Sequence, residues 1–129
     1  MKLPWSREET TGQQAERFAR GHLTSQGLTI LATNYATRRG EIDLVARDGE
    51  LLVFVEVRLR NHKGFASGAE SVDLRKQQRL VRAAEHYLQQ HFGSEPPPCR
   101  FDVVSLHTNR DNSKQFQVDW LKDAFRPMY

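Results

Sequence analysis

The sequence predicts a single domain of mixed α/β architecture. Two amphipathic segments, residues 11–26 and 72–92, carry apolar side chains at helical spacing, and a glycine follows each of them. Between and after these segments lie runs rich in β-branched and apolar residues, which are typical of strands. Helices and strands that alternate in this order predict an α/β domain.

Length and composition limit the alternatives. The 129 residues are 38% hydrophobic and 27% charged, which is enough for one buried core without disulfides or structural metal. We expect a flexible N-terminus at residues 1–10 and one domain over residues 11–129. The single cysteine, Cys99, excludes a disulfide framework, and the longest apolar run, residues 51–55, is too short to span a bilayer. With no apolar signal segment at the N-terminus, we expect a cytoplasmic protein without membrane association.

The remaining elements follow from local signals. Asp48-Gly49 lies between two strand-like runs and predicts a tight hairpin within residues 40–60. Glycine and three consecutive prolines end the second helix. The other predicted segments are a strand at 28–35, a basic loop at 36–40, a polar loop at 60–68, strands at 100–107 and 116–118, and a helical turn in the tail at 119–129.

The hairpin gathers acidic side chains on one face of the sheet. A two-residue turn at 48–49 fixes the register, and Asp43 then faces Phe54. In the same register Glu41 faces Glu56. Residues that face each other project from the same side of a sheet, so this face carries Glu41, Asp43, Glu56 and Arg58.

Three neighbouring carboxylates repel one another unless a cation lies among them. Mg²⁺ or Mn²⁺ held by oxygen ligands is the natural partner, and Arg58, two residues after Glu56, could stabilise a phosphate on the same face. This pattern predicts a metal-dependent phosphodiesterase. The alternative is a solvated strand face with ordinary cross-strand ion pairs. The position of Glu56 inside the most apolar segment favours the catalytic interpretation, because an unpartnered buried acid is costly.

Two strings stand out within the hairpin, G-E-I-D-L at 40–44 and F-V-E-V-R-L-R at 54–60. They resemble motifs of the YraN family of small bacterial proteins. Gly12 and Glu16, Asn34, the basic helix and R-F-D-V-V at 100–104 extend the resemblance over most of the chain. The YraN family is similar in turn to Holliday-junction-resolvase-like nucleases of the PD-(D/E)XK type. The resemblance implies a restriction-endonuclease-like fold, with a central mixed β-sheet flanked by helices.

The resemblance also assigns roles to individual residues. It implies that Asp43 and Glu56 hold the metal and that Glu16 is an accessory acid; Glu41 is a further candidate ligand. Arg58 stands where the nuclease pattern has lysine, and arginine cannot exchange a proton although it can bind phosphate. Lys76 could supply the missing ammonium if its helix packs close to the carboxylates. The catalytic residues are therefore expected to be Glu16, Asp43, Glu56 and Arg58.

Basic residues predict a nucleic-acid partner. The net charge is +3, and helix 72–92 carries a stripe of arginines. The alternative is a solvated helix face with a local Arg82–Glu85 ion pair. The residues expected to bind nucleic acid are Arg38, Arg39, Arg60, Arg75, Lys76, Gln77 and Arg79.

The leading hypothesis is thus a nucleic-acid-binding, metal-dependent endonuclease that hydrolyses phosphodiester bonds. DNA is the expected partner rather than RNA, and the resolvase likeness suggests branched DNA and a homodimer. Two other hypotheses remain open. One is a non-catalytic nucleic-acid-binding module of the same fold, which Arg58 favours, and the other is a protein-interaction module.

Overall fold

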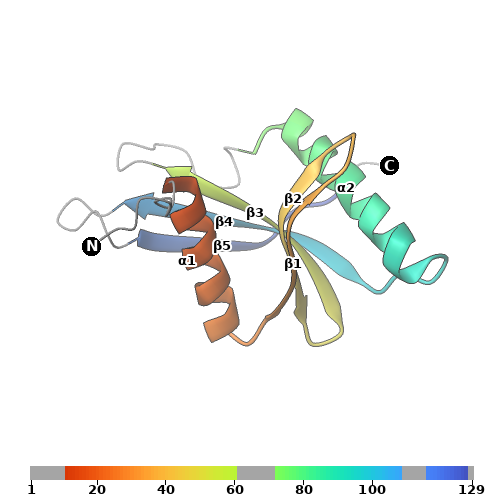
Figure 1. The fold of residues 1–129 in the computed structure, drawn as a ribbon, viewed down its shortest axis with the longest axis horizontal. Coiled ribbons are helices and arrows are strands. Elements are labelled where there is room, and N and C mark those ends of the chain that lie inside the picture. The colour runs from red at the N-terminus through yellow and green to blue at the C-terminus, as the bar shows by residue number, and fades with distance from the viewer. Residues whose placement is uncertain (1–10, 61–71, 109–115, 128–129) are drawn as a thin grey trace, which may run out of the picture.

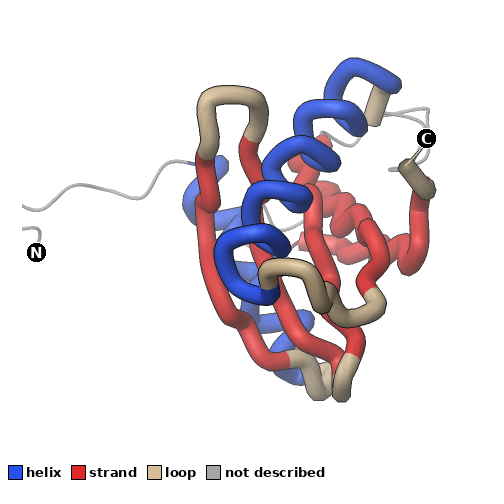
Figure 2. Tube along the Cα trace, turned by 90° about the vertical axis from the view of Figure 1, so that its right-hand side faces the viewer, coloured by secondary structure: helices blue, strands red, loops and turns tan. Residues whose placement is uncertain are grey.

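The computed structural model describes residues 11–60, 72–108 and 116–127, which form one mixed sheet with a helix on each face. Figure 2 shows α2 in front of the strands and α1 behind them. The predicted α/β class is confirmed. The elements shown in Figure 1 are α1 (Thr11–Ser25), β1 (Thr29–Ala36), β2 (Glu41–Asp48), β3 (Leu51–Arg60), α2 (Leu74–Phe92), β4 (Cys99–Thr108) and β5 (Phe116–Phe125).

The five strands lie in the sheet in their chain order, β1-β2-β3-β4-β5. Neighbours are antiparallel except β3 and β4, which are parallel and are joined through the crossover helix α2. Each face of the sheet has its own core. One core packs α1 against the sheet through Ala15, Ala19 and Leu23, and the other packs α2 through Leu80, Ala84 and Tyr87.

Helix α2 begins and ends at the residues that its sequence favours. The Asp73 side chain caps the N-terminus by accepting a hydrogen bond of 2.8 Å from the backbone N–H of Lys76. Gly93 follows the last turn with φ of 61°, and its N–H donates to the carbonyl of Gln89. The helix is therefore fixed at both ends, and this matters because its first turn reaches the candidate site.

The predicted hairpin register is wrong by two residues. Asp48 pairs with Leu51, so the two-residue turn is Gly49-Glu50 rather than 48–49. Only the first turn residue has a positive φ, 62° at Gly49, which is the pattern of a II′ turn with glycine in that position. Phe54 consequently pairs with Val45 and not with Asp43. The pairing of the two strands ends at Leu44 and Val55, so Asp43 and Glu56 lie directly beyond the last pair.

The predicted helical turn in the tail is also wrong. Residues 116–125 form a ten-residue strand, β5, which pairs along β4 with Trp120 opposite Val104. A register shift interrupts the pairing between Phe101 and Val103, and Asp123 adopts a positive φ of 52° there. This bulge breaks the simple alternation of apolar and polar residues, so the sequence lacked a clear strand pattern.

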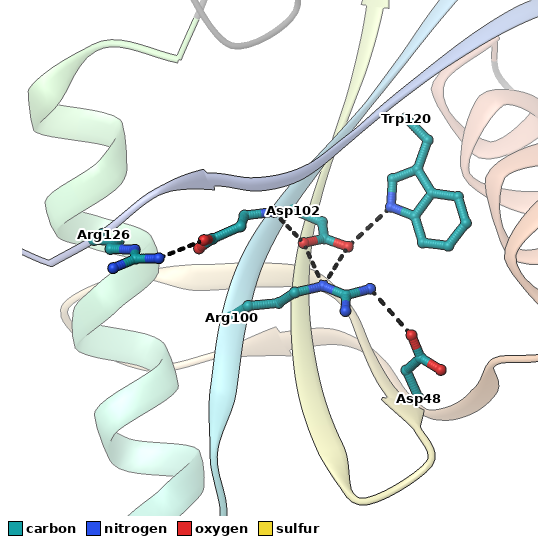
Figure 3. A network of polar contacts seen from close by, with 6 residues as sticks. Asp48, Arg100, Asp102, Trp120 and Arg126 are labelled. Carbon is teal, nitrogen blue, oxygen red and sulfur yellow. Dashed lines mark hydrogen bonds and ion pairs between the residues drawn. The ribbon is translucent and has the colours of Figure 1, made fainter.

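A buried polar network holds β5 in place (Figure 3). Asp102 is fully buried on β4 and accepts hydrogen bonds from Arg100 Nε, Trp120 Nε1 and the backbone N–H of Asp123, each at 2.9 Å. Arg100 also reaches Asp48 at the end of β2, 3.3 Å away. The network joins β2, β4 and β5, and it satisfies a carboxylate that would otherwise be costly to bury.

Within the described part of the chain, no helix is both long and apolar enough to cross a membrane. The predictions for the N-terminal residues 1–10 and for most of the loop at 60–68 fall outside the described residues.

Candidate active site

The acidic residues lie where β2 and β3 separate. The two strands pair from the hairpin up to Leu44 and Val55, and β3 continues beside β4. In Figure 1 they share the hairpin at the bottom and diverge above it. We call this point the fork. There Asp43 Oδ2 accepts a 2.8 Å hydrogen bond from the backbone N–H of Val57. A side chain of β2, rather than its backbone, therefore bonds to β3 at this point.

The fork interrupts the alternation predicted for β2. Ile42 packs in the core beneath α2, whereas Leu44 packs in the core beneath α1, although strict alternation would put both on one face. Asp43 lies between them, where both helices approach. Its charge interacts with Glu16 on α1 and with Lys76 on α2. Charged side chains from the helices on both faces of the sheet therefore act on the Asp43 carboxylate.

Glu56 is the most deeply buried acid of the fork, with 3% of its surface exposed. Burial, reinforced by the negative charge of Asp43, raises the pKa of Glu56 to about 7. Lys76 Nζ lies 2.6 Å from Glu56 Oε1, and a guanidinium nitrogen of Arg58 lies 3.9 Å from the same oxygen. The attraction of Lys76 opposes the upward shift of this pKa, but the desolvation of Glu56 outweighs it.

The carboxyl groups of Asp43 and Glu56 interact, and the negative charge of Asp43 contributes to the raised pKa of Glu56. The pKa of Asp43 is raised as well, chiefly by burial, and the hydrogen bond from Val57 opposes the shift. Two carboxyl groups in contact at low dielectric titrate as a pair and hold a proton between them at a pH where isolated acids would be ionised. A divalent cation would replace that proton and relieve the repulsion between the two ionised groups.

Glu16 approaches the fork from α1. Its Oε1 accepts a 2.8 Å hydrogen bond from Nδ2 of Asn34, and burial raises the pKa of Glu16. Asn34 lies between the pairs that β1 makes with β2 and has φ of 52°, a left-handed conformation that asparagine tolerates better than most residues. Asn34 on β1 and Asp43 on β2 both lie between the pairs Thr33–Leu44 and Tyr35–Ile42.

Glu41 does not join the two central acids as a third ligand. Its side chain is exposed, and its negative charge contributes only a smaller upward shift of the pKa of Asp43. In the described ranges, no three His, Cys, Asp or Glu residues are close enough to hold a metal ion together. Asp43 and Glu56 nevertheless suit Mg²⁺ or Mn²⁺, because Mg²⁺ in phosphate chemistry typically uses one or two carboxylates, several waters and the substrate phosphate.

Gly40 sets the position of α2 relative to the fork. A Cβ atom at Gly40 would lie 1.8 Å from the carbonyl oxygen of Arg79, so the backbone of α2 rests directly on the start of β2. Only glycine permits this approach. Lys76 lies three residues before Arg79, one helical turn away, and this docking brings its ammonium to Glu56.

The residues predicted to bind nucleic acid have different surroundings. Arg38, Arg39, Arg75 and Arg79 have exposed side chains, while Arg60 is half-buried at the end of β3. Two others contact the protein instead. Lys76 pairs with Glu56, and Gln77 Nε2 donates to the carbonyl of Val72 at 2.9 Å.

Sequence reasoning did not assign a function to Asn34 or to Gly40. Asn34 was noted only as part of the motif pattern, and the signal for its role is a polar side chain inside the strand-like run 29–36. Gly40 directly precedes the acidic motif, but its contact with α2 joins residues almost forty positions apart. Such a contact leaves no signal in local spacing.

Comparisons with known proteins agree with the motif resemblance. The model of the family described as "Uncharacterised protein family UPF0102" matches residues 15–106. A UPF0102 protein of Pseudomonas paraeruginosa is 48% identical over 114 residues, which cover 88% of this chain and 90% of the relative. One from Alkalilimnicola ehrlichii is 47% identical over 115 residues, covering 89% and 86%.

A third relative, from Pseudomonas savastanoi, is 44% identical over 123 residues, or 95% of this chain and 98% of its own. Among solved structures, one described as an EndoMS–dsDNA2 complex is similar, with 16% identity and a TM-score of 0.35. That match covers 78% of this chain and 38% of the other. The family match spans both strands of the fork and the helices on either side of it, so the chain belongs to the UPF0102 family, the YraN family that its motifs resemble.

Proposed function

We propose that this protein is a nucleic-acid-binding, metal-dependent nuclease that hydrolyses phosphodiester bonds at the fork. The observation that carries the proposal is the pair of interacting acids at the fork, buried Glu56 and half-buried Asp43, with the Lys76 ammonium 2.6 Å from Glu56. Replacing a buried ionic cluster by apolar side chains is often neutral or stabilising. A group of neighbouring acids with raised pKa values is typical of a functional site.

Asp43 and Glu56 would hold Mg²⁺ or Mn²⁺, with Glu16 nearby as an accessory acid. The bound cation would lower the pKa of a water molecule for attack on phosphorus and offset the charge of the phosphate. The hydrogen bond from Val57 fixes the direction of the Asp43 carboxylate, so this ligand needs no reorganisation. Asn34 orients Glu16 in the same way.

In this proposal Lys76 has the role that a lysine on the strand has in the nuclease pattern. Arg58 occupies that strand position, and its permanently charged guanidinium serves to bind phosphate rather than to transfer a proton. The Lys76 ammonium arrives from α2 and lies 2.6 Å from Glu56. With Glu56 engaged by a cation, Lys76 is placed to stabilise the negative charge that develops on the phosphate oxygens.

A second candidate is a non-catalytic nucleic-acid-binding module of the same fold. The observation that favours it is the Lys76–Glu56 ion pair itself, because this pair compensates part of the acidic charge without any metal. The two candidates differ in their need for a divalent cation. A nuclease requires one at Asp43 and Glu56, whereas a binding module does not.

The substrate class follows from the same reasoning and from the family resemblance. We propose DNA, branched forms included, met in the cytoplasm. The test is cleavage of labelled single-stranded, duplex, flapped and four-way-junction DNA with Mg²⁺ or Mn²⁺ by the parent, Asp43→Asn and Glu56→Gln. Cutting by the parent that both substitutions abolish supports the nuclease. Binding without cutting under every condition, unchanged in both variants, supports the binding module and refutes the nuclease.

A further inference from the structure

A basic groove lies beside the fork, between the β1–β2 loop and the outer face of α2. Its volume is about 1080 Å³, and its lining includes Arg38 and Arg39 from the loop with Arg82 and His86 from the helix. Glu85 is the acidic residue in its lining. Three guanidinium groups against one carboxylate make the groove suitable for an anion.

The arginines of the groove form no ion pair with the acidic residues that the structure describes. Within the described ranges, none of Arg38, Arg39 and Arg82 has an acidic partner within 4.0 Å. The local Arg82–Glu85 ion pair that the sequence allowed as an alternative does not form. These guanidinium groups are therefore available to phosphate oxygens, which they can bind with two parallel hydrogen bonds.

Both walls of the groove are held in place. In the loop, Thr37 Oγ1 accepts hydrogen bonds of 3.2 Å from the backbone N–H groups of Arg39 and Gly40. On the other side, the hydroxyl of Tyr35 on β1 forms a 2.5 Å hydrogen bond with Nδ1 of His86 on α2. Because the backbone carrying the arginines is already ordered, binding a ligand there loses little further conformational entropy.

The groove and the fork are arranged along the same helix. Arg82 and His86 lie six and ten residues after Lys76, which corresponds to about 9–15 Å at 1.5 Å per residue. Adjacent phosphates on one strand of duplex DNA are about 3.4 Å apart along the helix axis. For a duplex whose axis runs parallel to α2, this distance would correspond to roughly three or four nucleotides from a phosphate at Lys76 and Glu56.

We propose that this groove binds the phosphodiester backbone of the nucleic acid that occupies the fork, at phosphates a few nucleotides from the reacting one. The inference rests on the proposed function and extends it, because it assigns Arg82 and His86 to substrate binding. In this proposal the binding surface consists of the fork and the groove, and the Gly40–Arg79 contact lies between them.

The test measures binding of a labelled DNA duplex, without divalent metal, over a range of salt concentrations. The variants are Arg38→Gln, Arg82→Gln and the double variant. Arg47→Gln is the matched control, because Arg47 is an exposed arginine near the hairpin end of β2. A plot of log K against log salt has a negative slope, and each lost phosphate contact should make this slope less steep by about 0.9. We expect this decrease for each single variant, about twice as much for the double variant and none for the control.

The outcomes separate the groove from the proposed function. If the parent binds DNA and the groove variants keep its affinity and slope, the groove proposal is wrong while nucleic-acid binding stands. If the parent binds neither DNA nor RNA at low salt, the proposed function is wrong and the groove proposal falls with it. Binding of polyglutamate in that case, lost in the double variant, would identify an acidic protein segment as the ligand. Thermal melting of each variant confirms that it is folded.

Discussion

Replacing Glu56 with glutamine should stabilise the protein at alkaline pH and in the absence of metal. Glutamine keeps the shape of a protonated glutamic acid and can still donate a hydrogen bond to Asp43. In the parent, in contrast, ionising Glu56 costs free energy, because its carboxylate is buried and lies next to another acid. The substitution removes that cost while it leaves the packing nearly unchanged.

The magnitude follows from the pKa of Glu56, which rises from 4.5 to about 7 on folding. The folded state therefore binds this proton more tightly than the unfolded state, and the free energy of unfolding decreases as the pH rises through this interval. The full shift corresponds to about 3 kcal/mol, most of it lost between pH 4.5 and 7. The Glu56→Gln variant lacks this dependence, so it should match the parent near pH 4.5 and exceed its stability by about 2–3 kcal/mol at pH 8.

The assay is urea unfolding of the parent and the variant at several pH values between 4.5 and 8, with a chelator present. Glu50→Gln is the matched control, because Glu50 is an exposed carboxyl group in the hairpin turn. This control should follow the parent at every pH. A parent whose stability is constant from pH 4.5 to 8, or a Glu56→Gln variant that is less stable than the parent at pH 8, would refute the reasoning.

Three further predictions follow from single contacts. Gly40→Ala should lower stability by about 1–3 kcal/mol in urea unfolding, because its Cβ would overlap the Arg79 carbonyl and push α2 from the sheet; an unchanged midpoint would contradict this docking. Asp102→Asn should cost about 1.5–3 kcal/mol in the same assay, since it removes the buried charge that accepts from Arg100 while Arg100 keeps only its contact with Asp48, and an unchanged midpoint would argue against the network. Lys76→Gln should slow DNA cleavage on the order of 100-fold at saturating metal while Mn²⁺ still binds; a rate equal to that of the parent would remove Lys76 from the mechanism.

The fold was largely predictable because it depends on patterns that local sequence expresses. Both helices carry apolar residues at helical spacing and have distinct stop signals, and the hairpin carries a glycine at its turn. The hairpin register was less accessible. Asp48-Gly49 and Gly49-Glu50 are both plausible two-residue turns, and the choice depends on which residue carries the positive φ. An error of two residues, unlike an error of one, keeps the alternation of faces in the paired part of the hairpin. The fork then interrupts that alternation on β2, where Ile42 and Leu44 pack in different cores.

The sequence indicates the acidic residues of the candidate site more clearly than its cationic residues. Asp43 and Glu56 interrupt apolar strands, which is visible in the sequence. The approach of Lys76 depends on where α2 docks, and that docking depends on a long-range contact with Gly40. The continuation of β5 beyond the predicted strand 116–118 was not predicted for a related reason, because Asp102 on β4 bonds to Trp120 and Asp123 across a bulge. Interactions between distant residues have no periodicity that a single sequence reveals.

The central claim is that Asp43 and Glu56 together bind a divalent cation on which hydrolysis depends. The most direct test is a titration with Mn²⁺, followed by its paramagnetic resonance signal, with and without duplex DNA. We expect one Mn²⁺ per protein chain in the parent and in Glu50→Gln, and none in Asp43→Asn or Glu56→Gln. Urea unfolding of both site variants under the same conditions tests whether they are folded when they fail to bind Mn²⁺. Failure of the parent to bind Mn²⁺ in either condition, or undiminished binding by both site variants, would contradict the account.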